Sequence, residues 1–399
     1  MSPDRRLRFG AFIAPFHPPE ENPYLAYRRD VELVEHMDRL GFEEAWIGEH
    51  HSAGYELIAS PELFIAAVAE RTRHIRLGTG VVSLPYHHPL MVADRINQLD
   101  HMTRGRVMFG VGPGALPSDA FMMGIDVQSQ RDRMDEAIGV LVPLLSGETV
   151  SHESDWFSLR DARLQLRPFT EPHVEIAVAS QVSPAGARAA GKHGLSLLSI
   201  GATTTGGFNA LASNWQICAD KAEEHGRAID RRNWRLVGPM HIAETRDQAR
   251  EDVRFGLEAW LHYFREVAAL PLAPAGGVDD AVDALNASGF AVIGDPDDAA
   301  GQLEKCWEQS GGFGAFLFLA HNWASFERTR ESYELFARYV APRFQGLCEP
   351  RKASMEWAVA NRPAFIGAMT QAIGSEMQKH NQEQAAKRAL DGPKASKAS

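Results

Sequence analysis

Short apolar segments alternate with longer amphipathic segments about eight times between residues 7 and 340 of this chain. A strand followed by a helix, repeated in this way, is typical of a parallel sheet whose strands are connected by helices. Eight repeats over about 340 residues favour a closed (β/α)8 TIM barrel over an open, doubly wound sheet. The expected strands are residues 7–14, 45–47, 75–82, 106–111, 175–179, 195–200, 234–242 and 315–319.

The spacing of apolar residues predicts the helices between these strands. In the first of them, Leu33, Val34, Met37 and Leu40 share one face, and Gly41 follows as a C-terminal glycine should. The expected helices are residues 24–40, a helix opening at 61, and 90–102, 131–145, 184–192, 208–224, 248–267 and 326–340.

Two insertions interrupt the alternation. Residues 148–168 show the short alternating pattern of a hairpin insertion. Residues 268–295 are rich in Ala, Gly, Pro and Asp and break the rhythm before the last strand. A long irregular insert on a barrel is often a mobile active-site lid, and a disordered surface loop is the alternative.

The composition changes near Glu349. We expect the barrel to occupy residues 1–348 and a helical extension to occupy 349–390, bent at Pro363. Residues 391–399 are of low complexity and are expected to be a disordered tail.

Charge and cysteine content exclude several classes of protein. The chain has 41 Lys and Arg against 52 Asp and Glu, a net charge of -11, which argues against binding to nucleic acid or to an anionic membrane surface. Three cysteines without a Cys-x-x-Cys pair predict neither a disulfide framework nor a zinc site. With no apolar signal core and no run of about 20 apolar residues, a cytoplasmic protein is expected.

The most reactive group of residues follows the second expected strand. The apolar run 45–47 ends in Gly48-Glu49-His50-His51, so a carboxylate and two imidazoles lie just past a strand's carboxyl end. In a barrel this end carries the chemistry, because its loops share one cavity. The alternative is a structural role, in which one histidine caps the strand and the other faces water.

Other strand ends add residues that should face the same rim. They are Gly80 and Val81, the run Gly112-Pro113-Gly114, the run Ser180-Gln181-Val182-Ser183, and Ser199 with Ile200. Glycines let a flat ligand lie close to backbone. The serines precede a helix that opens at Pro184, and such a helix terminus suits a phosphate, although an ordinary N-cap would look the same. Together these ends indicate a planar, phosphate-bearing cofactor.

Other kinds of site fit less well. Adjacent His50 and His51 do not easily point at one ion, and the usual metal-ligand spacings are absent, so no metal is expected. The chain also has no Gly-x-Ser-x-Gly elbow and no Walker A motif.

Several ordered motifs resemble the bacterial luciferase-like flavin monooxygenases. They are Glu-Ala-Trp-Ile-Gly-Glu-His-His at 44–51, Leu-Gly-Thr-Gly-Val-Val-Ser-Leu-Pro at 77–85, and the run 99–114 that ends in Gly-Val-Gly-Pro-Gly, with further matches at 180–186 and 293–298. The resemblance runs from about Leu7 to Phe344 and is greatest to members of the limonene 1,2-monooxygenase type, a label that also covers relatives with other substrates.

The resemblance implies a two-component enzyme. Reduced FMN, or FAD in some members, would come from a separate NAD(P)H-dependent flavin reductase. It would react with O2 to a C4a-hydroperoxide that oxygenates a small apolar compound such as a terpene, aldehyde or ketone. A homodimer is also implied.

The resemblance also assigns roles to residues. His50 would be the catalytic histidine, donating a hydrogen bond as a neutral imidazole, with Gly48 and Glu49 beside the ring. The Gly80–Val81 peptide would be cis, and residues 268–295 would be the lid. Aromatic residues would keep water from the mouth, with core packing as the alternative for each: Phe9, Phe12, Phe16, Tyr86 and Phe109.

Some positions depart from luciferase itself. Pro113 stands where luciferase has a phosphate-binding arginine, Gly112 where it has a cysteine, and Ser180-Gln181 where it has Glu-Ser. Phosphate binding should then rest on the turn from Ser180 to Ser183, and light emission is not expected. Two other functions stay open on this barrel: a deazaflavin-dependent dehydrogenase and a flavin-binding protein without turnover.

Overall fold

Parallel strands close into a barrel at the centre of the protein. The computed structural model describes residues 6–14, 16–268, 272–390 and 392. Within them the barrel order is β3-β2-β1-β13-β10-β9-β8-β5, and β3 also pairs with β5, which closes the ring. All these pairings are parallel, so the (β/α)8 expectation is confirmed. The strands are β1 (Arg8–Ile13), β2 (Glu44–Ile47), β3 (Arg76–Thr79), β5 (Val107–Gly112), β8 (Ile176–Ser180), β9 (Ser196–Ser199), β10 (Arg235–Gly238) and β13 (Ala315–Leu319).

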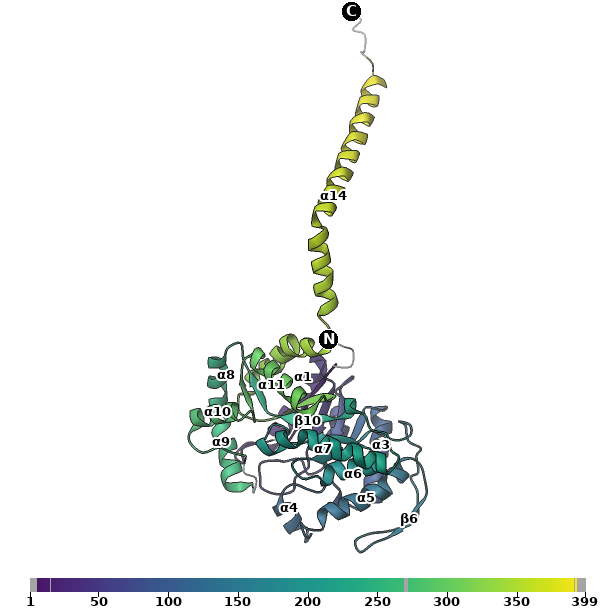
Figure 1. Ribbon diagram of the computed structural model, residues 1–399, viewed down its shortest axis with the longest axis vertical. Helices are drawn as coiled ribbons and strands as arrows, with labels where there is room; N and C mark the ends of the chain where they lie inside the picture. The colour runs from purple at the N-terminus through teal and green to yellow at the C-terminus, as the bar shows by residue number, and fades with distance from the viewer. Residues whose placement is uncertain (1–5, 15, 269–271, 391, 393–399) are drawn as a thin grey trace, which may run out of the picture. The chain divides into compact units, whose positions relative to one another are not determined.

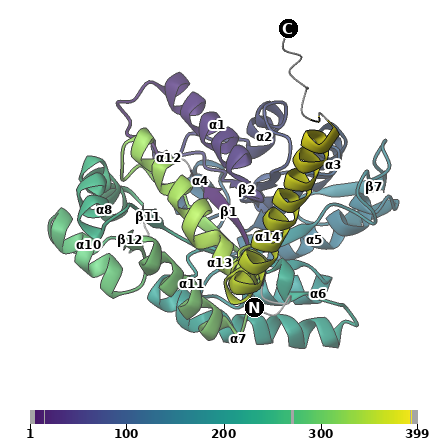
Figure 2. The ribbon, with the colours of Figure 1, turned by 90° about the horizontal axis from the view of Figure 1, so that it is seen from above.

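Helices surround the barrel, as the view from above shows (Figure 2). Asn22 caps the first of them, accepting a hydrogen bond from the backbone N–H of Tyr24 at 3.0 Å. Gly41 ends it with φ at 82°, the left-handed conformation that glycine adopts most easily. The helices are α1 (Pro23–Leu40), α2 (Pro61–Ala69), α3 (Pro89–Thr103), α4 (Pro117–Met122), α5 (Gln130–Leu145), α6 (Ala185–His193), α7 (Thr205–Glu224), α11 (Pro296–Ser310), α12 (Phe326–Leu335) and α13 (Ala341–Gln345).

Side chains alternate between two apolar layers along each strand. In β1, Phe9, Ala11 and Ile13 pack under the helices, while Phe12 fills the barrel interior with Trp46 and Leu317. Phe9 contacts Phe336 and Phe344, and Phe109 also belongs to the helix-facing layer. The expectation that Phe9 and Phe109 line the mouth is therefore wrong, because the two-residue period of a strand turns them outward.

A buried charge network lies at the amino ends of the strands. Arg235, fully buried at the start of β10, donates to both carboxylate oxygens of Glu44, at 2.9 and 3.0 Å. It also pairs with Glu175, which receives a hydrogen bond from Arg76 at 2.9 Å. The network joins the starts of β2, β3 and β10 on the side of the barrel opposite the expected site.

Two expected strands are broken in the structure. The third ends at a cis Gly80–Val81 peptide, the geometry that the family resemblance implies, and resumes as β4 (Val82–Ser83). The seventh is divided at Pro239, which has no N–H to donate. Beyond it, β11 (Met240–Ile242) leaves the barrel and pairs with β12 (Val292–Gly294).

The insertion before the last strand is more regular than the sequence indicated. The expected helix 248–267 is divided into α8 (Arg246–Asp252), the short η4 (Val253–Phe255), α9 (Leu257–His262) and the π-helix η5 (Tyr263–Val267). Residues 278–287 form α10, and β12 follows; residues 269–271 lie outside the described part. These elements share an apolar cluster that includes Phe16, Trp260 and Trp323. The irregular backbone expected there is therefore wrong for α10 and β12, because Val282, Leu285 and Ile293 pack in this cluster.

A hairpin and three short helices complete the described part of the barrel unit. The hairpin expected at 148–168 is present as β6 (Val150–Glu153) and β7 (Ser158–Ala162), which pair antiparallel. The 3-10 helices η2 (Leu84–Tyr86) and η3 (Arg231–Asn233) precede α3 and β10, and the π-helix η6 (Phe336–Val340) joins α12 to α13.

The chain divides into two compact units, residues 1–345 and 346–399. The second holds one helix of 42 residues, α14 (Glu349–Leu390), with Pro363 inside it (Figure 1). The expected tail, 391–399, lies outside the described residues except for Gly392. Among the described helices, none combines the length and the apolar character needed to cross a bilayer.

Candidate active site

His50 lies between two carboxylates at the barrel mouth. Its Nδ1 donates to Asp119 Oδ2 at 3.3 Å, and its Nε2 lies 3.2 Å from Glu56 Oε2. Asp119 comes from the short α4 and is 1% exposed. It also accepts hydrogen bonds from the backbone N–H of His51 and from the Ser52 hydroxyl. The hydrogen bond from Nδ1 orients the His50 ring, and the Glu56 carboxylate forms an ion pair on the Nε2 side.

The two carboxylates determine the charge of His50. Burial lowers the pKa of His50, but Glu56 and Asp119 outweigh that effect and raise the pKa to about 8. At pH 7 the ring is therefore mainly an imidazolium. The neutral imidazole expected from the sequence is wrong at this pH, because that expectation included no carboxylate on either side of the ring.

The raised pKa makes part of the stability pH-dependent. An ordinary histidine has a pKa of 6.5, so protonation of His50 stabilises the fold fully below that pH, and the contribution is lost as the pH rises through about 8. A shift of this size corresponds to about 2 kcal/mol. We expect urea unfolding of the wild type to lose about 2 kcal/mol more between about pH 6 and pH 9 than unfolding of His50→Gln. An equal loss of unfolding free energy in both proteins would contradict this prediction.

Glu49 holds a second, separate cluster. Its Oε1 accepts hydrogen bonds from His51 Nε2 at 2.8 Å and His87 Nε2 at 2.7 Å, and its Oε2 accepts from the Ser83 backbone at 2.9 Å. Burial raises the pKa of Glu49, but the bonds from His51 and His87 outweigh it and lower the pKa to about 2. Glu49 is thus a buried, anionic anchor for the loop after β2 and the loop after β4.

These three side chains are also the described group best placed to hold a metal ion. Two ligands on one tetrahedral ion of about 2.1 Å bond length stand more than 3 Å apart. The two nitrogen–oxygen distances here are 2.7 and 2.8 Å, which are hydrogen-bond lengths. We therefore treat the cluster as hydrogen-bonded structure.

A cavity of about 390 Å³ opens on the carboxyl ends of β5, β8 and β9. It brings together eight of the residues that the sequence placed at the rim: Val81, Pro113, Gly114, Ser180, Gln181, Val182, Ser183 and Ile200. Arg131, at the start of α5, also lines it. This arginine was missed from the sequence, because nothing in the helix pattern of 131–145 distinguishes it from a solvated charge.

Two features of this cavity suit an anionic, flat ligand. The hydroxyl oxygen of Ser180 is buried and, among the described residues, has no hydrogen-bond partner. Gly114 has φ at +95°, and a Cβ there would stand 2.3 Å from the Tyr86 hydroxyl. The cavity therefore contains an unused donor beside backbone that no larger residue could occupy.

The other predicted residues lie outside the lining. Gly48, Glu49, Gly80 and Gly112 do not line the cavity. A Cβ on Gly112 would stand 2.5 Å from Val81 Cγ2, so Gly112 lies directly behind a lining residue. Ser199 does not line it either, and its hydroxyl accepts a hydrogen bond from Trp234 Nε1 at 2.9 Å.

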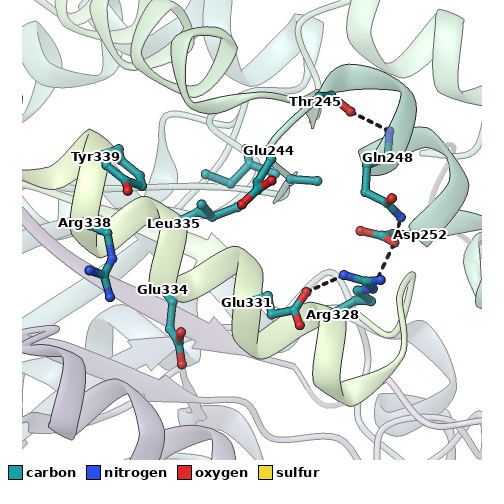
Figure 3. A pocket seen from close by; sticks show the side chains of 12 residues that line it. Glu244, Thr245, Gln248, Asp252, Arg328, Glu331, Glu334, Leu335, Arg338 and Tyr339 are labelled. Atoms are coloured by element: carbon teal, nitrogen blue, oxygen red, sulfur yellow. Dashed lines mark hydrogen bonds and ion pairs between the residues drawn. The ribbon is translucent and has the colours of Figure 1, made fainter.

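A second cavity, of about 580 Å³, lies away from these residues (Figure 3). It is formed by the end of β11, α8, α12 and η6, and its lining residue Arg328 pairs with both Asp252 and Glu331. It contains none of the predicted site residues. Its polar lining is: Glu244, Thr245, Gln248, Asp252, Arg328, Glu331, Glu334, Arg338 and Tyr339.

Comparison with known proteins identifies the class. Residues 7–313 match the family described as luciferase-like monooxygenase. The chain belongs to this family, which confirms the resemblance drawn from the motifs. It is a flavin-dependent monooxygenase on a TIM-like barrel.

Two relatives narrow the class further. The chain is 48% identical over 375 residues to limonene 1,2-monooxygenase of Rhodococcus erythropolis, covering 94% of this chain and 96% of that protein. It is 47% identical over 359 residues to 4-hydroxyprotoasukamycin monooxygenase of Streptomyces nodosus subsp. asukaensis, covering 88% and 96%. The chain is thus of the limonene 1,2-monooxygenase type in sequence.

A solved structure agrees with the fold. It is the oxygenating constituent of 3,6-diketocamphane monooxygenase from Pseudomonas putida, a type II Baeyer–Villiger monooxygenase in complex with FMN. It superposes with a TM-score of 0.69 at 25% identity, covering 85% of this chain and 98% of that one.

Proposed function

We propose that this protein binds reduced FMN in the mouth cavity and uses it with O2 to oxygenate a small apolar compound. The observation that carries the proposal is the Ser180 hydroxyl, which is buried and has no hydrogen-bond partner among the residues that the structure describes, in a cavity formed by the expected rim residues. The FMN complex of the diketocamphane enzyme supports FMN as the cofactor, with FAD as the other candidate.

The residues of the cavity fit the phosphate end of a flavin. Ser180 and Ser183 offer hydroxyl groups ahead of α6, and Arg131 offers a guanidinium without an ion-pair partner among the described residues. A charged hydrogen bond of this kind contributes about 1.5–3 kcal/mol. We assign phosphate binding to Ser180, Gln181, Val182, Ser183 and Arg131.

The ring end would rest on the remaining rim. Val81, Pro113, Gly114 and Ile200 provide apolar and backbone surface. Gly112, which packs against Val81, would act from behind this surface and shape the loops, as would Gly48, Glu49, Gly80 and Ser199.

The protein's own groups would control protons and water at this site. The bound flavin supplies the electrons that activate O2. His50 holds a proton next to Glu56 and Asp119, where it can donate a hydrogen bond to a developing negative charge. The apolar cluster of Phe16, Tyr55 and Tyr263 would limit water at the mouth.

The proposal includes a partner and a compartment. Two relatives are named as oxygenating components, which supports a separate NAD(P)H-dependent flavin reductase. We place the enzyme in the cytoplasm, which suits its three free cysteines. We also propose a homodimer, a barrel domain at 1–348 and a separate role for 349–390.

The dehydrogenase alternative has weaker support. F420-dependent enzymes match this barrel at 19% identity, which shows the fold alone. The relatives at 47% and 48% identity are monooxygenases.

The decisive experiment mixes the protein with chemically reduced FMN and ¹⁸O2, with limonene and camphor as probe substrates. We expect one ¹⁸O atom in the product and a slower flavin reoxidation trace than in buffer. Hydride transfer without ¹⁸O incorporation would support the dehydrogenase. Tight binding of FMN without any product from a panel of terpenes, aldehydes and ketones would support the binding protein.

The phosphate assignment predicts a selective loss of affinity. Ser180→Ala and Arg131→Met should each weaken FMN binding about ten-fold, because each removes one hydrogen bond to a charged group. Riboflavin, which lacks the phosphate, serves as the control, and its affinity should stay within two-fold (about 0.4 kcal/mol). Fluorescence titration measures both ligands. Equal losses for FMN and riboflavin would place the phosphate elsewhere.

A further inference from the structure

We propose that Glu56 is a positioning residue of the oxygenation site: its carboxylate, held by the Tyr263 hydroxyl, fixes the ring of His50 and keeps a proton on Nε2. The inference rests on the role of His50 in the proposed function. It adds a residue that no motif in the sequence indicated.

The carboxylate of Glu56 has one charged partner among the residues described. Its Oε2 lies 3.2 Å from His50 Nε2, and in the part of the chain that the structure describes this is its ion pair. The same oxygen is buried and, within the part of the chain that is described, has no hydrogen-bond partner. A buried carboxylate oxygen of this kind depends on the imidazolium for compensation of its charge.

Backbone contacts hold Glu56 in place beside the histidine. The Glu56 backbone forms an antiparallel bridge with Phe16. The His50 N–H donates to the Ile58 carbonyl at 3.0 Å, so the loop folds back over the end of β2. The separation of the two side chains is therefore set by the fold of the loop.

The other oxygen of Glu56 is held by the insertion. Tyr263, at the start of η5, donates its hydroxyl to Glu56 Oε1 at 3.3 Å. Tyr263 is 1% exposed, and its ring lies 4.8 Å from that of Tyr55 and 5.4 Å from that of Phe16. Burial raises the pKa of Tyr263, so its hydroxyl stays protonated and remains a donor.

Carboxylates lie on both sides of the His50 ring. Asp119 faces Nδ1 and Glu56 faces Nε2, with Glu49 and His51 as the other titratable groups nearby. Asp119 alone would orient the ring but would leave Nε2 free to lose its proton. Glu56 thus keeps the proton at the nitrogen that points away from Asp119.

The test is a direct titration of His50 by NMR in histidine-labelled apoprotein, with His50→Gln used to assign the signal. Removing an opposite charge within about 4–6 Å lowers a histidine pKa by about one unit or more. We therefore expect Glu56→Gln to lower the pKa of His50 by at least about one unit, and Glu56→Asp to restore part of it. Glu20→Gln, an exposed change in the loop after β1, is the charge control and should leave the pKa within about 0.2 units.

A fall in Glu56→Gln that is no larger than in Glu20→Gln would overturn the proposal. FMN affinity is measured on the same samples, because the proposed function predicts binding and this inference predicts the His50 titration. Failure of the wild-type protein to bind FMN would therefore count against the proposed function alone.

A double-mutant comparison with Glu56 tests the role of Tyr263. Tyr263→Phe should move the pKa of His50 in the wild-type background and have no effect in Glu56→Gln, because the hydroxyl acts through that carboxylate. The same effect in both backgrounds, or none in either, would remove Tyr263 from the arrangement.

Discussion

Replacing Arg235 by methionine is expected to lower the free energy of unfolding of the barrel by about 3–5 kcal/mol. Methionine has a similar length but no charge. Glu44, fully buried, would lose both of its bonds from Arg235 and keep those from Arg8 and the Trp46 indole. Burial raises the pKa of Glu44 and Arg235 lowers it far below its usual range, so the carboxylate is ionised and its desolvation would no longer be offset.

Urea unfolding of the barrel measures the loss of unfolding free energy. Arg6→Met is the matched control, since Arg6 forms an exposed ion pair with Glu43 at 2.9 Å and should contribute about 0–1 kcal/mol. The double variant Arg235→Met with Glu44→Gln should recover part of the stability, because the unpaired charge is removed with its partner. A loss below about 1 kcal/mol in Arg235→Met would mean that water or Arg8 compensates Glu44.

Changing His50 to glutamine should reduce oxygenated product by about 100-fold or more, because a positioned proton donor contributes at least that much. Glutamine keeps the size of the side chain and one hydrogen-bond donor but cannot carry the charge that Glu56 and Asp119 face. Consumption of O2 should continue, with hydrogen peroxide released in place of product.

Three measurements on one sample distinguish uncoupled turnover from weaker flavin binding. They are product by mass spectrometry, peroxide by a coupled assay, and FMN affinity by fluorescence. Affinity should stay within a few-fold (about 1 kcal/mol), since His50 does not line the cavity assigned to the flavin. His225→Gln, an exposed change after α7, is the control and should match the wild type. Coupling of O2 to product as efficient as in the wild type would remove His50 from the reaction.

The barrel could be predicted because its signal is local. Each strand is a short apolar run and each helix has its own spacing, so the order of elements follows from the chain itself. The two broken strands, at Gly80–Val81 and at Pro239, carry local signals as well. Helix α10 could also have been found, since Val278, Ala281, Val282 and Leu285 repeat at helical spacing.

The electrostatics of the site could not be predicted in the same way. Asp119 reaches His50 from 69 residues away, and Tyr263 reaches Glu56 from 207 residues away. Such pairs exist only once the loops have met, so a charged His50 could not be inferred from the order of residues alone. Arg131 faces the cavity for the same reason, through the packing of α5 beside the mouth.

The two ends of the barrel have separate roles. Arg235 and Glu44 secure the amino ends of the strands, while His50 and the cavity occupy the carboxyl ends. Side chains that share no partner and lie far apart usually contribute independently. Directed evolution of this enzyme toward a new substrate could therefore select for thermal stability at one end and for selectivity at the other in separate libraries, and then combine the selected substitutions with little loss.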